Sequence, residues 1–403
     1  MTDTRRGTRS TPLAPTGLRH VDRAVAEHGQ TGRAWLEGMW HADPLADTVV
    51  ADRAAARVVR EALAGADRSG VGAAAGALLD HVTTDPPWLE RDRLDRAADV
   101  LVRHTAPWGL CLGAASLLRG ADNAIAAKPL QLTGRYAAEP AVRSIEVGEW
   151  LAEVVRPGGM AVGGPGWVRT VRVRLIHARV RRHVGSSTAW DHDAWGVPVP
   201  QPYLAFTLAE FGHVSLEAMT HLGVRLRRRE LDDVYHLWRY VGHLIGVEPA
   251  LLPATEADHV RIEDLYRLTS PGPDDDARLF TRALVEQYLA PQLATLGVGP
   301  SAVREAVARR LVNGMTRVFL GSAAADDLGV PGGPLERFAA LGVRAAAPGL
   351  LVADQSRLLL LGRQRVTRRA YAVREREMDR LRREQGMLHD LVDAVPGAVG
   401  HPG

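Results

Sequence analysis

Apolar side chains recur at helical spacing over most of this chain, and this pattern constrains the fold more than any other feature. Glycine ends two of the apolar stripes, at Gly246 and Gly321. We find no convincing strand-like alternation and no tight hairpin turns between strand-like runs. The sequence therefore predicts an all-α protein. The three clearest stripes are Leu204, Leu208, Phe211, Ser215, Met219 and Leu222; Leu231, Val234, Trp238, Val241 and Ile245; and Leu311, Met315, Val318 and Phe319.

The domain organisation follows from where this periodicity begins and ends. Residues 1–18 are rich in Thr, Arg, Pro and Gly, so we expect a disordered N-terminal segment. Residues 395–403 form a Pro- and Gly-containing tail that we expect to be flexible. The Pro/Gly breaks between these ends are short and separate single helices. We therefore predict one large helical domain over residues 19–394.

Composition excludes several classes of function. The net charge is only +3 and the acids are interleaved with the arginines, so we expect no nucleic-acid partner. Cys111 is the only cysteine, which rules out an intrachain disulfide or a site held by several thiolates. No run approaches the ~18 apolar residues of a membrane span, and no apolar stretch follows the Arg5-Arg6 pair. We expect a cytoplasmic protein without a membrane span.

The segment 158–184 combines glycines with a long arginine-rich helix that carries one histidine. Residues three and four apart on a helix share a face, so His177 is expected on an apolar, interior face. An imidazole in such a place either bonds to core groups or binds an iron atom. Both interpretations remain open from the residues alone. The face predicted to be interior contains Val173, Ile176, His177, Val180 and Val184, and the arginines predicted to face water are Arg172, Arg179 and Arg182.

Cys111 and Gly113 form a Cys-x-Gly sequence within a segment of small, apolar residues. Some haem monooxygenases have a Cys-x-Gly sequence around the cysteine that binds the iron. Those enzymes place a phenylalanine and a glycine upstream, where this chain has His104 and Pro107. We therefore interpret Cys111 as a buried packing residue.

Other histidines also lie at spacings that metal sites use. Glu210 and His213 form a Glu-x-x-His pair, and Glu217 and His221 would add ligands, but no partner helix that completes a di-iron site is evident. His236 and His243 lie two turns apart beside an apolar stripe, and we interpret them as boundary residues. Nine arginines between Arg363 and Arg383 are mixed with acids, which favours a solvated helix over an anion-binding site.

The order of several short motifs resembles that of the latex-clearing protein (rubber oxygenase) and MpaB-type oxygenase family. The resemblance covers roughly residues 35–320. The motifs that carry it are Asp43-Pro-Leu-Ala-Asp47, Asp85-Pro-Pro-Trp88, Thr133-Gly134-Arg135, Arg143, Gly158-Gly159, Trp167, Arg174-Leu-Ile-His177-Ala-Arg-Val-Arg181, Trp195-Gly-Val-Pro198, the helix around Phe211, Trp238-Arg-Tyr-Val-Gly242, Leu244-Ile-Gly246 and Leu251-Leu-Pro253.

This resemblance implies a globin-like helical core that holds haem b, with His177 as the proximal iron ligand and Arg143 on the distal side. The sequence departs from the family at two positions. Rubber oxygenases have a lysine and a threonine three and four residues after that arginine, where this chain has Glu146 and Val147. The family's base glutamate has no clear counterpart, since neither Asp122 nor Glu139 can be placed in that role.

The resemblance also leads to a hypothesis about function. We expect a haem b-dependent oxygenase that uses dioxygen on a small apolar or unsaturated molecule, such as an isoprenoid or a natural-product intermediate. Arg174 and Arg181 flank His177 and would bind the haem propionates; otherwise they are surface arginines. The alternative function is a carrier of haem or of a hydrophobic ligand that retains the fold without the chemistry.

Overall fold

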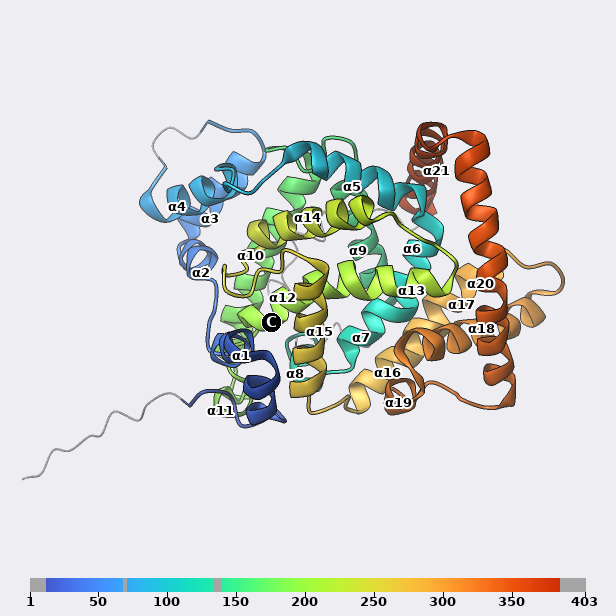
Figure 1. The fold of residues 1–403 in the computed structure, drawn as a ribbon. Coiled ribbons are helices and arrows are strands. Elements are labelled where there is room, and N and C mark those ends of the chain that lie inside the picture. Colours follow the sequence, from blue (N-terminus) through green and yellow to red (C-terminus); the bar gives the residue numbers. More distant parts are fainter. Residues whose placement is uncertain (1–11, 68–70, 133–139, 385–403) are drawn as a thin grey trace, which may run out of the picture.

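The computed structural model describes residues 12–67, 71–132 and 140–384, and these residues form helices and turns without a strand (Figure 1). The prediction of an all-α fold is confirmed. The helices up to residue 185 are α1 (Val21–Gly38), α2 (Pro44–Ala51), α3 (Arg53–Leu63), α4 (Ala73–Thr83), α5 (Arg91–Arg103), α6 (Thr105–Cys111), η1 (Leu112–Ser116), α7 (Leu117–Ala121), α8 (Ala124–Leu132), α9 (Pro140–Val154) and α10 (Pro165–Gly185). The later helices are α11 (His192–Trp195), α12 (Gln201–Ala209), η2 (Glu210–Val214), α13 (Ser215–His221), α14 (Arg228–Ile245), α15 (Glu256–Thr269), α16 (Asp275–Leu284), η3 (Val285–Leu289), α17 (Ala290–Ala294), α18 (Ser301–Leu320), α19 (Ser322–Asp327), α20 (Pro334–Leu361) and α21 (Arg363–Glu384).

Three of the described helices run through a π turn, labelled η1, η2 and η3, before they continue as α-helix. The η1 turn packs against both η2 and η3. The Ser116 hydroxyl of η1 donates a hydrogen bond to the carbonyl oxygen of Glu210 at the start of η2 (2.7 Å). Because π turns inside helices frequently occur at functional sites, the η1 and η2 region is a natural place to look for chemistry.

Large aromatic side chains fill the core between these helices. Trp35, Trp108 and Trp167 are fully buried, and their indole N–H groups donate to Thr269, Ser215 and the carbonyl of Val82, respectively. These hydrogen bonds satisfy donors that would otherwise be buried without a partner. They also join segments far apart in the sequence, so the tryptophans fix helix positions as well as filling volume.

The three predicted apolar stripes lie where the sequence places them. Within α12–α13, Leu204, Leu208 and Met219 are each no more than 2% exposed. The second stripe belongs to α14, which ends at Gly246 with φ of +87°. The third belongs to α18, which ends before Gly321. Helical periodicity and glycine termination were therefore sufficient to locate these helices.

The N-terminal prediction is wrong for residues 12–18. The backbone N–H of Gly17 donates to the carbonyl of Ala194, and Leu18 is buried in the main core. Trp40 donates to the carbonyl of Pro12 (2.9 Å). The Thr, Pro and Gly content that suggested disorder is instead used in a packed turn. Residues 1–11 and the tail 395–403 lie outside the described residues.

Helices α20 and α21 lie at one edge of the molecule, on the opposite side from α3 and α4 (Figure 1). The arginine-rich α21 is mostly exposed in its described part and packs against α5. The Tyr371 hydroxyl donates to Asp99 of α5 (3.2 Å), and Arg363 forms an ion pair with Glu230 of α14 (2.5 Å). Among the described helices, none is long and apolar enough to cross a bilayer.

Helix α8 is fastened to the start of α16 by Lys128, the only lysine of the chain. Its ammonium group lies 3.1 Å from Asp274, which also accepts from the side chain of Gln131. Asp274 caps α16 by accepting from the backbone of Ala277. One carboxylate thus joins two helices and caps one of them.

Candidate functional site

The face of helix α10 that packs against the core differs from the face that the apolar pattern predicts. Its fully buried side chains include Trp167, Thr170 and Ala178. His177 is half-buried, and so are Val173, Ile176 and Val180, whereas Val184 is buried as expected. The prediction of an interior apolar face centred on His177 is therefore wrong in detail. Of the arginines expected to face water, only Arg182 is exposed, while Arg172 and Arg179 are half-buried.

Two ion pairs made by buried arginines explain this orientation of α10. Arg174 is 2% exposed, and its guanidinium binds both carboxylate oxygens of Asp43 (2.6 and 2.9 Å). One turn further along α2, Asp47 binds Arg181 (2.9 Å), which also donates to the carbonyl of Val199. A bidentate pair compensates for the burial of the charge in a way that an unpaired arginine could not.

These contacts show that Arg174 and Arg181 lie in the protein interior. The alternative that they are surface arginines is wrong, since both are buried. In the structure they bind the carboxylates of Asp43 and Asp47. Burial raises the pKa of Asp47, an effect that the charge of Arg181 opposes.

The end of α14 closes over the first of these pairs. Gly246 adopts φ of +87°, and a Cβ atom there would lie 2.6 Å from the Asp43 carboxylate and 2.7 Å from Arg174 Nε. Glycine is required both for the left-handed backbone and for this close approach. The Leu244-Ile-Gly246 motif is thus explained by packing around the ion pair.

Helix α9 carries the residues expected on the distal side and packs along α10. Trp150 of α9 donates to Thr170 of α10 (3.0 Å), and Glu149 pairs with Arg169 (3.5 Å). Arg143 lies in the first turns of α9, but its side chain is outside the described part of the structure. One turn later, Glu146 and Val147 are half-buried.

Of the two acids that the sequence left without a role, only Asp122 lies in the part of the chain that the structure describes. Asp122 pairs with Arg119 (3.2 Å), and burial raises the pKa of its carboxyl to about 6. Glu139 lies outside the described residues.

Cys111 is completely buried where α6 passes into η1. Burial raises the pKa of its thiol far above the usual range, so it stays protonated and apolar in character. The interpretation of Cys111 as a packing residue is confirmed.

Both residues of the Glu-x-x-His pair, Glu210 and His213, lie in the π turn η2, but their side chains have different neighbours. A Cβ at Gly120 would lie 2.8 Å from Glu210, which places that carboxylate beside α7. His213 instead lies 3.8 Å from Glu217 and 3.8 Å from Glu263 of α15. The partner helix that the sequence did not reveal is therefore α15. A carboxylate fifty residues downstream on an ordinary helix gave no sequence signal.

His221, the fourth candidate ligand, lies against Phe319 with ring centroids 6.1 Å apart. It does not belong to the group of three potential ligand atoms formed by His213, Glu217 and Glu263.

A second group of histidines lies between α4 and α14. His81 and His243 stack with ring centroids 4.4 Å apart, and the Nε2 of each contacts the backbone carbonyl of the other (3.2 and 3.3 Å). His236 accepts a hydrogen bond from the backbone N–H of Glu90 and is 4% exposed. The interpretation of His236 as a boundary residue is therefore wrong, whereas His243 is half-buried.

The lowered pKa values of these histidines predict that the folded state loses stability in acid. Burial, supported by the charges of His81 and Arg174, lowers the pKa of His243 to about 4 from 6.5. Burial also lowers the pKa of His236 to about 4. Between pH 6.5 and 4 these two histidines bind more protons in the unfolded chain than in the folded one, so their contribution to the free energy of unfolding should fall as pH decreases through this window. Each such histidine contributes at most about 1.4 kcal/mol per pH unit.

Urea unfolding at several pH values between 7 and 4 measures this dependence. The variant His243→Gln, which retains a side-chain donor, should show a shallower slope than the wild type. The same change at the exposed His183 of α10 is the matched control and should retain the wild-type slope. Equal slopes for all three proteins would contradict the assignment.

Comparison with known proteins gives a consistent family. Residues 99–350, more than half of the chain, match the family described as ER-bound oxygenase mpaB/B'/Rubber oxygenase, catalytic domain. The rubber oxygenase of Streptomyces sp. (strain K30) is 25% identical over 295 residues, which is 70% of this chain. That match spans just under two thirds of the relative's own length, 66%.

A solved structure of latex clearing protein in the closed state shares the fold. The TM-score is 0.60 at 18% sequence identity, and the match covers 82% of this chain and 89% of that chain. The family match spans α9 and α10 as well as the three π turns. With the fold and the sequence in agreement, this chain belongs to the family of the mpaB and rubber oxygenase catalytic domains.

Proposed function

We propose that this protein is a haem b-dependent oxygenase that acts on a small apolar or unsaturated molecule. The observation that carries the proposal is the position of His177, which lies within the matched family domain on a half-buried, apolar part of α10. The oxygenase class is inferred from the names of the relatives. The cofactor is inferred from the resemblance of the motif around His177 to that of the family.

The residues around His177 fit a haem. Its Nδ1 atom is buried, and the adjacent Val173, Ile176 and Val180 are only partly covered by the described residues. On the neighbouring α9, a Cβ at Gly148 would have no atom of the described residues within 4 Å. A nitrogen donor beside incompletely covered β-branched side chains suits a flat apolar group whose metal needs a nitrogen ligand from the protein.

In this proposal, His177 would hold the haem iron and Arg143 would act on the reactants. A haem bound there would supply the iron chemistry that activates dioxygen. Arg143, one helix away, would donate hydrogen bonds to negative charge that develops on the reactants. Buried Arg174 and Arg181 would act indirectly, because their ion pairs with Asp43 and Asp47 fix the position of α10.

The substrate class follows from the partly covered side chains near His177, which are valine and isoleucine. An isoprenoid or a natural-product intermediate with a double bond would suit such surroundings. A haem or hydrophobe carrier of the same fold is the second candidate. It is favoured by Glu146 and Val147, which replace the lysine and threonine that the resemblance leads one to expect.

Oxygen consumption by the haem-loaded protein separates the two candidates, with Arg143→Ala as the decisive variant. An oxygenase should consume oxygen in the presence of an unsaturated isoprenoid, and Arg143→Ala should reduce turnover about 10²–10³-fold because one preorganised donor is lost. Haem content should stay near wild type, because His177 supplies the bond. Arg143→Lys should rescue only partly, since a point charge does not reproduce the planar guanidinium.

A carrier gives a different set of results. It would bind haem without consuming oxygen with any unsaturated substrate tested. If Arg143→Ala instead lowers the melting temperature and leaves turnover per bound haem unchanged, Arg143 has a structural role, for instance in an ion pair with Glu146.

A further inference from the structure

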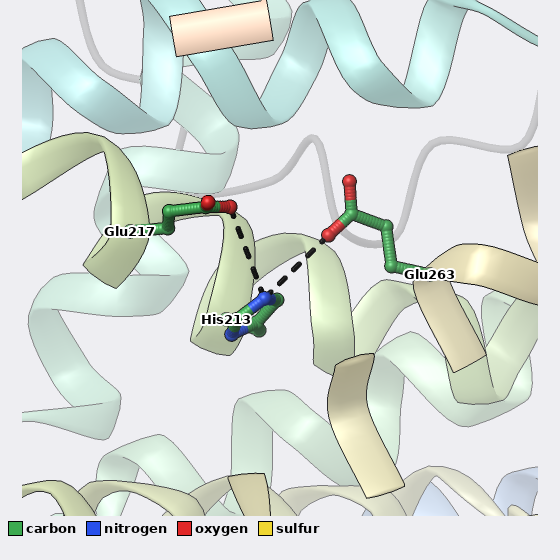
Figure 2. A group of neighbouring side chains, drawn as sticks. All are labelled: His213, Glu217 and Glu263. Carbon is green, nitrogen blue, oxygen red and sulfur yellow. Dashed lines mark ion pairs between the residues drawn. The ribbon is translucent and has the colours of Figure 1, made fainter. Parts of the chain in front are cut away.

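Three potential metal ligands meet beside the π turn η2, on elements that the proposed haem site does not use. His213 comes from η2, Glu217 from α13 and Glu263 from α15 (Figure 2). Their ligand atoms all lie within 4.8 Å of one another. The Nε2 atom of His213 points between the two carboxylates, 3.8 Å from an oxygen of each (Figure 2).

These separations are too long for hydrogen bonds, which need about 2.7–3.2 Å between nitrogen and oxygen. They are close to the spacing of neighbouring ligands around one cation. Metal–ligand bonds of about 2.1 Å place adjacent ligand atoms roughly 3.0–3.5 Å apart. A small inward rotation of the side chains would complete such a site.

Neighbouring groups orient His213 and Glu263 as outer-shell residues orient metal ligands. The Tyr235 hydroxyl lies 3.3 Å from Nδ1 of His213, where it can accept the ring proton and leave the Nε2 lone pair facing the carboxylates. Arg119 lies 3.1 Å from the Glu263 oxygen that faces away from His213. In this tautomer, a cation placed between the two carboxylates would accept the nitrogen lone pair and balance the negative charge.

Access from solvent is also present. The side chain of Glu217 is 58% exposed, while those of His213 and Glu263 are 13% and 9% exposed. The site is therefore buried on the side of α15 and open on the side of α13. Water would complete the coordination of a cation bound there.

We propose that His213, Glu217 and Glu263 bind one first-row divalent cation, of the kind of Mn²⁺, Fe²⁺ or Zn²⁺. Mixed imidazole and carboxylate ligands suit these ions better than Ca²⁺, which prefers oxygen ligands alone. The bound cation fastens the π turn to α15 and stabilises the folded state. The site is independent of the haem proposal, because none of its ligands lies on α9 or α10.

The test uses the full-length protein, freed of metal by a chelator and dialysed. Titration with Mn²⁺ alone, followed by the loss of the six-line electron paramagnetic resonance signal of the free ion, should show saturable binding of one equivalent per chain. Zn²⁺ should compete for the same site and raise the melting temperature. His213→Ala and Glu263→Gln should abolish this binding, and Tyr235→Phe should weaken it about tenfold.

Glu217→Gln keeps the test independent of folding, because this exposed side chain can lose its charge without disturbing the core. Binding should weaken at least about tenfold in this variant. Glu61→Gln on α3 is the matched control, since Glu61 is 59% exposed and forms a similar helical ion pair with Arg57. The absence of saturable Mn²⁺ binding overturns the proposal, and so does equal binding by Glu217→Gln and Glu61→Gln.

Discussion

Replacement of His177 by alanine is expected to abolish haem binding. In the proposed site this imidazole would be the protein's ligand to the iron, so its removal would take away the bond that holds the haem. The variant should fold, because His177 is half-buried and the neighbouring ion pairs of α10 are unchanged. Reconstitution with haemin, followed by the Soret absorbance and the haem content per chain, measures the effect. Circular dichroism then checks that the helices are intact.

Cys111→Ala is the matched control for that experiment. Cys111 is the other residue that the sequence raises as a ligand of haem iron, and it is fully buried with a thiol that stays protonated. The control variant should retain the wild-type spectrum. Loss of haem by the Cys111 variant together with its retention by the His177 variant would show that the proposed ligand is wrong.

Asp43→Asn should lower the free energy of unfolding by about 3–5 kcal/mol. The substitution retains the size of the side chain and its capping oxygen for α2, but it leaves the charge of Arg174 buried and unpaired. The carbonyl of Leu244, at 3.4 Å, is too distant to compensate. Urea unfolding at neutral pH measures this loss.

Two further variants show whether the buried charge is the cause. Asp52→Asn changes the N-cap of α3, which is exposed, and should cost only a few tenths of a kcal/mol. Asp43→Asn combined with Arg174→Met should recover most of the lost stability, because no unpaired charge then remains. A loss below about 1 kcal/mol in the Asp43 variant would show that the ion pair does not stabilise the fold.

The sequence was sufficient to predict the helices because their signals are local. Apolar spacing located α12–α13, α14 and α18, and glycine after the last apolar residue located the ends of two of them. The family resemblance was recognisable from the order of short motifs, several of which now have structural roles. Asp43 and Asp47 bind the arginines of α10, and Gly246 allows α14 to end against the first pair.

The orientation of α10 could not be predicted in the same way. Valines, isoleucine and arginines are distributed around this helix, so no single face is clearly apolar. The face that enters the core contains Arg174 and Arg181, which a hydrophobicity pattern places in water. Their burial depends on carboxylates of α2, more than 130 positions earlier in the chain. Only the tertiary structure brings these charges together.

Glu263 and the π turns escaped prediction for related reasons. Glu263 approaches His213 only because α15 packs against η2. A π turn inserts one extra residue without breaking the apolar stripe, and so Phe211 within the turn and Ser215 directly after it both remain buried. The Glu-x-x-His spacing was therefore read on the wrong helical geometry, and Glu210 was grouped with His213 although it lies beside α7.

The single lysine that joins α8 to α16 makes this protein unusually suited to selective chemistry. Lys128 is 27% exposed, so an amine-directed dye has one reachable side chain whose position is defined by Asp274. Trp195 lies next to it, with the ring centroid 5.9 Å from the ammonium group. A fluorophore attached there would report from a fixed point next to α10, since α8 packs against that helix. Quenching of its emission would report haem uptake in a protein in which no proposed ligand has been mutated.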